Sequence, residues 1–166
     1  LGGFTEGYGD GGGVLMNHAA ARLENCTVVG NRTMGSGGGV KLTAGTVTNC
    51  IVYGNSATVA GNDFLLPATP WVGFSCSPDL VNDPFGTGNR SGSPQFVDPG
   101  SGVGLDHVLG DYHVLKNSPC IDTGHLLSGL EEGLDLSGGP RLLNEGIDIG
   151  AYETWVPPAG TIMILR

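Results

Sequence analysis

Two short patterns of apolar and polar residues recur in the first half of the chain. The segment from Asn25 to Asn31 reads Asn-Cys-Thr-Val-Val-Gly-Asn, and a near copy from Asn49 to Asn55 follows 24 residues later. A Gly-Gly-Gly-Val motif at residues 11–14 returns 26 residues on. Because each copy is a short run of Val, Ile or Thr between Gly and Asn, the pattern predicts strands separated by corners. A period in the twenties predicts a solenoid, in which each repeat stacks on the next.

The predicted fold class is all-β, a right-handed parallel β-helix with an irregular C-terminal cap. A repeat of 24–26 residues has room for three short strands and three corners, and the region shows no helical spacing of apolar residues. We expect residues 1–76 to form the coils, as the end of a longer solenoid, and residues 77–166 to form a loop-rich cap packed on the last coil. The expected inward residues are Val14, Met16, Leu23, Cys26 and Val28, with their counterparts Val40, Leu42, Val47, Cys50 and Val52.

Stacking gives the repeated asparagines a physical role. Equivalent positions in successive coils would lie about 4.8 Å apart, which is the spacing of neighbouring strands. The side-chain amides of Asn31 and Asn55 would then form a hydrogen-bonded ladder at a corner. Asn25 and Asn49 would form a second ladder at a bend.

The four cysteines divide into two pairs. Cys26 and Cys50 occupy equivalent positions, where parallel side chains fit the dihedral angle of a disulfide poorly, so we expect stacked free thiols there. Cys76 and Cys120 lie in the irregular half. A disulfide between them would join the cap to the coils and suit an oxidising compartment, and free thiols are the alternative. The spacings contain no Cys-x-x-Cys motif for zinc or redox chemistry.

The chain after Asn55 is rich in Pro, Gly, Asp and Ser, and it holds only short predicted elements. One helical turn is predicted over residues 126–130, and a last strand over residues 161–165. Extended segments are predicted at residues 64–66, 71–74, 95–97, 112–115, 120–122, 134–136 and 147–149.

Several motifs of the second half occur in a characteristic order. Ser-Pro-Cys-Ile-Asp at residues 118–122 and Asp-Ile-Gly-Ala-Tyr-Glu at residues 148–153 are the most specific. They follow Phe-Ser-Cys-Ser-Pro at residues 74–78, Gln-Phe-Val-Asp-Pro at residues 95–99 and Gly-Asp-Tyr-His-Val-Leu at residues 110–115. Over most of residues 11–153 this order resembles the bacterial choice-of-anchor Q domain proteins. The resemblance implies a secreted right-handed β-helix of the pectate-lyase-like superfamily, located outside the cell or on its surface.

Composition narrows the range of partners. The formal net charge is −9, from 16 acidic and 7 basic residues, which disfavours nucleic acid and anionic membrane surfaces. No apolar run approaches the roughly 20 residues needed to span a bilayer. Because the chain begins at Leu1 rather than Met and shows no N-terminal cap, we expect upstream coils or another protein chain to stack on residues 8–17.

Carboxylates are concentrated in the second half, and two roles are open to them. As structural residues they would accept hydrogen bonds from loop N–H groups, and one would pair with Arg141. The alternative is a Ca²⁺ site at Asp106 and Asp111, in a Gly-rich loop; no other metal or cofactor is expected. The expected structural acceptors are Asp122, Asp135 and Asp148. The histidines His18, His107, His113 and His125 show no metal-binding spacing and are predicted to be scattered surface residues.

The outward positions of the coils carry almost no charge. Only Lys41 is charged, and no carboxylate pair of the kind that inverting glycosidases use is present, so we predict no catalytic set. Tyr53 and Trp71 are candidates for stacking on sugars, whereas covering an edge or the core is the commoner use of aromatic side chains. The outward residues are expected to be Thr27, Val29, Lys41, Thr43, Thr48, Ile51 and Tyr53.

The sequence therefore predicts a secreted or cell-surface structural and binding module without catalytic activity of its own. Its regular face would present side chains to a glycan or a protein partner. One alternative is the C-terminal part of a polysaccharide lyase or hydrolase whose active site lies elsewhere. Another is a filament subunit that self-associates by stacking its open end on the cap of the next chain.

Overall fold

The computed structural model describes residues 4–5, 9–66, 71–81, 86–129, 132–143 and 146–157. These residues form short strands and two 3₁₀ turns, and they contain no α-helix. The strands are β1 (Phe4–Thr5), β2 (Val14–Glu24), β3 (Thr27–Val29), β4 (Arg32–Thr33), β5 (Val40–Thr48), β6 (Ile51–Tyr53), β7 (Ser56–Ala57), β8 (Phe64–Leu65), β9 (Trp71–Gly73), β10 (Phe96–Asp98) and β11 (Asp111–Val114). The 3₁₀ turns are η1 (Pro78–Leu80) and η2 (Gly104–Asp106).

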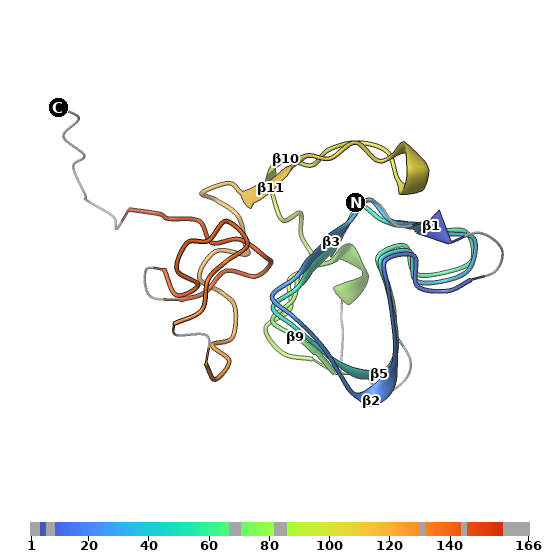
Figure 1. Cartoon of the computed structure of the whole chain (residues 1–166), viewed down its shortest axis with the longest axis horizontal. Coiled ribbons are helices and arrows are strands. Elements are labelled where there is room, and N and C mark those ends of the chain that lie inside the picture. Colours follow the sequence, from blue (N-terminus) through green and yellow to red (C-terminus); the bar gives the residue numbers. More distant parts are fainter. Residues whose placement is uncertain are drawn as a thin grey trace.

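Strands of the first half pair in parallel, one repeat apart. The sheets run in the orders β1-β4-β7, β2-β5-β8 and β3-β6, and β9 also pairs with β5. The register places Val14 beside Val40, and Val28 beside Val52. Figure 1 shows these strands superposed along the viewing direction, on the sides of a shared interior. The prediction of a mostly β chain with parallel strand pairs is confirmed.

The interior holds the apolar residues that the repeat predicts to point inward. All five residues predicted for the second repeat are completely buried, whereas Val14, Leu23 and Cys26 of the first are only partly buried. The first repeat is less covered because β2 and β3 are edge strands within the described residues. Burying one such aliphatic side chain contributes about 1.5–3 kcal/mol.

The corners explain the recurring Gly and Asn residues. Gly11 and Gly37 have φ near +72°, and Asn25 and Asn49 have φ of 53° and 55°. Left-handed backbone is tolerated by Gly, which has no Cβ, and by Asn, whose short side chain bonds locally. The same turn geometry therefore returns in each repeat.

The last repeat is closed by η1. Cys76 forms parallel bridges to Ile51 on one side and to Arg90 on the other. The chain then turns at η1, where the Leu80 side chain enters the main core. The carboxylate of Asp79 accepts hydrogen bonds from the N–H groups of Asp63 and Phe64. We call residues 9–66 and 71–81 the stacked part.

The rest of the chain packs against one side of the stacked part. We call residues 94–129, 132–143 and 146–154 the lateral part. Its β10 and β11 pair antiparallel, and Phe96, Val114 and Ile149 form a second core with Ile51. In Figure 1 the lateral part, in yellow to red, lies outside the superposed strands, next to β3.

Two expectations about this region are corrected by the packing. Thr48 and Ile51 were predicted to point outward, but they are 3 % and 1 % exposed. Ile51 is buried because it packs with the lateral part in the second core. The cap was expected on the last coil alone, yet it bonds to both repeats: Ala151 donates to the Thr27 hydroxyl, and Gly150 donates to the Asn49 carbonyl.

The minor elements were predicted with mixed success. Strands at β10 and β11 are confirmed to within one residue. The helical turn predicted over residues 126–130 is wrong, since residues 126–129 are not helical. Residues 120–122 form a turn rather than a strand, and the strand predicted over residues 161–165 lies outside the described residues.

Candidate functional site

The first asparagine pair lies at a buried corner. The side-chain amide and the backbone N–H of Asn31 both donate to Asn55 Oδ1 at 2.9 Å. The Asn55 amide donates in turn to the Val28 carbonyl and to Asp63 Oδ1, each at 2.9 Å. Asp63 was not foreseen, because it follows Asn55 by eight residues outside the repeated motif. Burial raises the pKa of this carboxyl to about 6, while its bonds from Asn55 oppose the rise.

The second asparagine pair joins the two parts of the molecule. Asn49 Nδ2 donates to Asn25 Oδ1 at 3.0 Å. The Asn49 side chain also bonds the backbone of His125, donating to its carbonyl at 2.8 Å and accepting from its N–H at 2.7 Å. Arg141 Nη2 donates to Asn25 Oδ1 at 3.1 Å. Both asparagines are therefore docking points for the lateral part.

All four cysteines are unbridged in this structure, and they lie in the two expected pairs. Cys50 is buried beside Cys26, and their mutual hydrogen bond lowers the pKa of the Cys26 thiol to about 7. Cys76 and Cys120 are both buried in the second core. Their hydrogen bond raises the pKa of Cys76 and lowers that of Cys120. The structure thus brings the predicted disulfide pair together as thiols.

The two candidate sugar-stacking residues lie in different sheets. Tyr53 is half-buried at the end of β6, with its ring edge-on to Phe96 at a centroid distance of 6.3 Å. It lines an open pocket of about 170 Å³ together with His107 and the loop from Pro99 to Gly102. Trp71 is exposed on β9, where its indole covers Gly73. Tyr53 therefore lines a pocket, whereas the Trp71 indole lies exposed on another sheet.

The candidate Ca²⁺ ligands occupy separate places. Asp106 ends η2 and lines a shallow surface pocket with Arg32. Asp111 begins β11, and its carboxylate is bonded to His113 at 2.6 Å. Among the described residues, no three His, Cys, Asp or Glu side chains gather in a way that would hold a metal ion.

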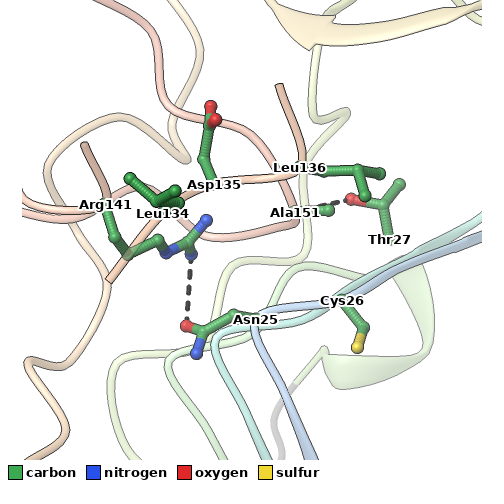
Figure 2. A pocket seen from close by; sticks show the side chains of 8 residues that line it. All are labelled: Asn25, Cys26, Thr27, Leu134, Asp135, Leu136, Arg141 and Ala151. Atoms are coloured by element: carbon green, nitrogen blue, oxygen red, sulfur yellow. Dashed lines mark hydrogen bonds between the residues drawn. The ribbon is translucent and has the colours of Figure 1, made fainter. Parts of the chain in front are cut away.

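A larger pocket, of about 400 Å³, lies where the lateral part meets the bend at Asn25. Figure 2 shows Arg141 reaching across it to Asn25. The Arg141 side chain is buried; it donates to the Asp148 and Gly150 carbonyls at 2.9 and 2.7 Å. The residues that line this pocket are Asn25, Cys26, Thr27, Leu134, Asp135, Leu136, Arg141 and Ala151.

The ion partner of Arg141 is Glu153, at 3.2 Å, and not one of the three aspartates named from the sequence. Both Glu153 carboxylate oxygens accept from the Asp148 N–H, at 3.1 and 3.0 Å. Burial and the neighbouring Asp148 carboxylate raise the pKa of Glu153 to about 8, and Arg141 opposes this rise. The glutamate was missed because only the fold brings residues 141 and 153 into contact.

The aspartates of this region bind backbone N–H groups. Asp135 accepts from Ser137, Gly139 and Glu153, at 2.8–2.9 Å. Asp148 accepts from Asp122 and Thr154, each at 2.8 Å. Asp122 is thus linked to the network through its backbone N–H. The structural role expected of Asp135 and Asp148 is confirmed by these bonds.

A hydrogen-bonded group of Asp111, His113 and Ser137 was not predicted from the sequence. His113 Nδ1 is 2.6 Å from Asp111 Oδ1, and His113 Nε2 is 3.0 Å from the hydroxyl of Ser137. The imidazole lies on the Tyr152 ring, with 4.2 Å between ring centroids. Asp-x-His on a strand does place both side chains on one face, which is a usable signal. Ser137 gives no such signal, since it comes from a distant turn.

The side of the stacked part that carries β3 and β6 holds pockets that were not predicted from the sequence, among them those at Arg141 and at Tyr53. Among the described residues there is no candidate for a membrane-spanning helix.

No protein-family model, curated protein or solved structure matches this chain.

Proposed function

We propose that the chain is a secreted or cell-surface right-handed parallel β-helix module that binds a neutral glycan on its outer side. The fold proposal is supported by parallel registers of 24–27 residues in successive strands and by left-handed corners at equivalent positions. The resemblance to choice-of-anchor Q domain proteins supports the location.

The observation that carries the binding proposal is the pocket at Tyr53. It combines aromatic rings from Tyr53 and Phe96 with an imidazole from His107 and the polar backbone of the Gly100–Gly102 loop. Sugar-binding sites join an apolar ring face, which stacks on the sugar, to a few polar groups that bind its hydroxyls. The net charge of −9 disfavours an acidic polysaccharide, because like charges repel.

Binding to a panel of neutral oligosaccharides, followed by calorimetry on any that bind, tests this proposal. His107→Ala removes a polar group of the pocket and should weaken binding at least about tenfold. His18→Ala changes an exposed histidine on β2 and should leave the affinity unchanged. Trp71→Ala tests the other candidate aromatic residue. If Trp71→Ala abolished binding and His107→Ala did not weaken it, the glycan would bind at β9 and not in the pocket at Tyr53. Failure of every neutral oligosaccharide to bind would overturn the proposal.

A protein partner is proposed at the edge formed by β2 and β3. Each of these strands has one neighbour within the described residues, and Leu15 of β2 is 52 % exposed. Edge strands of this kind pair readily with a further strand. The other end of the stack is closed by Leu80 of η1, which opposes end-to-end growth into a filament. Light scattering should therefore find no concentration-dependent fibres, and fibres would favour the filament alternative.

A further inference from the structure

Asp111, His113 and Ser137 form a linear chain of hydrogen bonds. The His113 hydrogen bond lowers the pKa of Asp111, so this carboxylate is ionised and can only accept. The proton on His113 Nδ1 must then point at Asp111, across 2.6 Å. In the neutral imidazole, Nε2 is left as an acceptor for the Ser137 hydroxyl at 3.0 Å. The three side chains are therefore arranged as a nucleophile (Ser137), a general base (His113) and a carboxylate that positions the base (Asp111).

The surroundings of Ser137 leave room for a substrate. Ser137 is exposed in a turn that is closed by the Gly138 N–H on the Asp135 carbonyl at 3.0 Å. A Cβ placed on Gly138, the next residue, would meet no atom within 4 Å, so the turn itself is uncovered. The Tyr152 ring packs against the imidazole, tilted by 34° with 4.2 Å between ring centroids, and limits its rotation. Solvent access and a held base are both needed for a serine nucleophile.

A pocket with a mixed polar and apolar lining contains residues that neighbour this group. Leu136, the neighbour of Ser137, and Tyr152, which packs against His113, both line this pocket of about 320 Å³. Leu109 and Tyr112 line it as well, and Leu136 and Leu109 are 71 % and 67 % exposed. The side chains of Leu136, Leu109 and Tyr112 offer this pocket's contacts to an apolar acyl or aryl group.

From this geometry we propose that Ser137 and His113, positioned by Asp111, hydrolyse small carboxylic esters that carry an apolar group. Ser137 Oγ attacks the ester carbonyl carbon and its proton passes to His113 Nε2. The bond from that carbon to the leaving oxygen breaks, and the departing alkoxide takes the proton from His113. Water then attacks the acyl-serine, giving its proton to His113, which returns it to Ser137 as the carboxylic acid leaves. This activity is independent of glycan binding at Tyr53.

The substrate class follows from the backbone donors of the turn. The N–H groups of Ser137, Gly138 and Gly139 all donate to Asp135, at 2.9, 3.0 and 2.8 Å. They are therefore not aimed at a developing oxyanion, and losing one such donor costs serine hydrolases roughly 10²–10³ in kcat. The site suits activated esters, such as phenyl esters, whose leaving group needs little help.

Hydrolysis of p-nitrophenyl acetate and butyrate by the full chain tests the activity. Ser137→Ala and His113→Ala should each lower the rate at least about 100-fold, toward the uncatalysed background. Asp111→Asn should lower kcat and leave KM unchanged, as expected of a residue that acts through His113. Ser91→Ala and His18→Ala alter exposed residues elsewhere and should retain the full rate.

Labelling with a fluorophosphonate probe tests the nucleophile without depending on any variant. Mass spectrometry of digested wild-type protein should find the probe on Ser137, and the label should disappear in His113→Ala. Circular dichroism of each variant checks that the fold is kept. A wild-type chain that takes up no label, or a Ser137→Ala variant that hydrolyses the esters at the wild-type rate, would overturn the proposal.

Discussion

The stacked part and the lateral part bind their backbone polar groups in different ways. In the stacked part, N–H groups donate to carbonyls one repeat away, as Ile51 does to Cys26 and Cys76 does to Cys50. In the lateral part, one antiparallel strand pair is present among the described residues, and carboxylates of Asp135 and Asp148 take up loop N–H groups.

This difference explains why acidic residues gather late in the chain. Buried backbone groups must be paired, and a segment without ladders has to use side chains for this. In the stacked part, hydrogen bonds between strands pair the backbone, and the sequence has to supply only corner residues and an apolar interior. In the lateral part, a single carboxylate pairs several loop N–H groups. One substitution there should therefore destabilise one loop region, whereas the stacked part should respond as a whole.

The largest effect is expected at the ion pair that anchors the lateral part. Arg141→Met removes the buried donor to the Asp148 and Gly150 carbonyls, one of the two donors to Asn25 Oδ1, and the cation beside Glu153. Leaving a buried carbonyl without its donor costs about 1–3 kcal/mol, and here two carbonyls lose theirs. Denaturant unfolding should show this loss, and hydrogen exchange should rise first in the lateral part. Arg22→Met, whose side chain is 69 % exposed, is the control and should change stability by less than about 0.5 kcal/mol.

The interior of the stacked part should respond nearly as strongly. Leu42→Ala empties a completely buried site, which costs about 2–5 kcal/mol through lost transfer energy and a residual cavity. The loss should appear in urea unfolding as a lower midpoint with an unchanged slope. Leu15→Ala, on the outer side of β2, is the matched control. Equal losses at the two leucines would contradict the placement of the interior.

The asparagine corner should have an intermediate effect. Asn55→Ala removes the acceptor of Asn31 and the donor to the Val28 carbonyl, both buried. Leaving such groups unsatisfied costs about 1–3 kcal/mol. Asn17→Ala, at an exposed position of β2, provides the comparison. An unchanged unfolding free energy in Asn55→Ala would show that the ladder is not structural.

The smallest expected effect is a dependence of stability on pH that originates in the lateral part. Glu153 has an ordinary pKa of 4.5, which the fold raises to about 8. Between these values the folded state keeps a proton that the unfolded chain has released, so stability falls as pH rises across this range.

Unfolding at pH 5 and pH 8 should therefore differ by at least about 1 kcal/mol, with the lower pH more stable. Glu153→Gln should flatten the dependence, whereas Glu24→Gln, at a half-exposed position, should not. Asp63, with a pKa raised to about 6, adds a smaller change of the same sign from the stacked part. A Glu153→Gln variant with the wild-type pH dependence would contradict the assignment.

What could be predicted from sequence follows the same division. Val40, Leu42 and Val52 were placed correctly because a repeat fixes the spatial neighbour of each residue through its spacing. Ile51 was misplaced because its outer side is covered by residues more than 20 positions away that belong to no repeat.

The candidate sites could not be predicted from the sequence, because their residues also come from distant segments that belong to no repeat. Arg141 and Glu153 meet through loops whose path no local pattern specifies. His113 and Asp111 share a strand face and were within reach of the sequence, but Ser137 joins them only through tertiary packing. Local periodicity predicts interiors, whereas clusters on an irregular surface depend on the complete fold.

The central claim is that residues 24 apart lie side by side in parallel strands. Nuclear Overhauser effects between backbone protons of β3 and β6 test it most directly. Parallel stacking predicts cross-strand contacts that join Val28 to Val52 and Thr27 to Ile51. Absence of these contacts, or the pattern of an antiparallel pair, would contradict it.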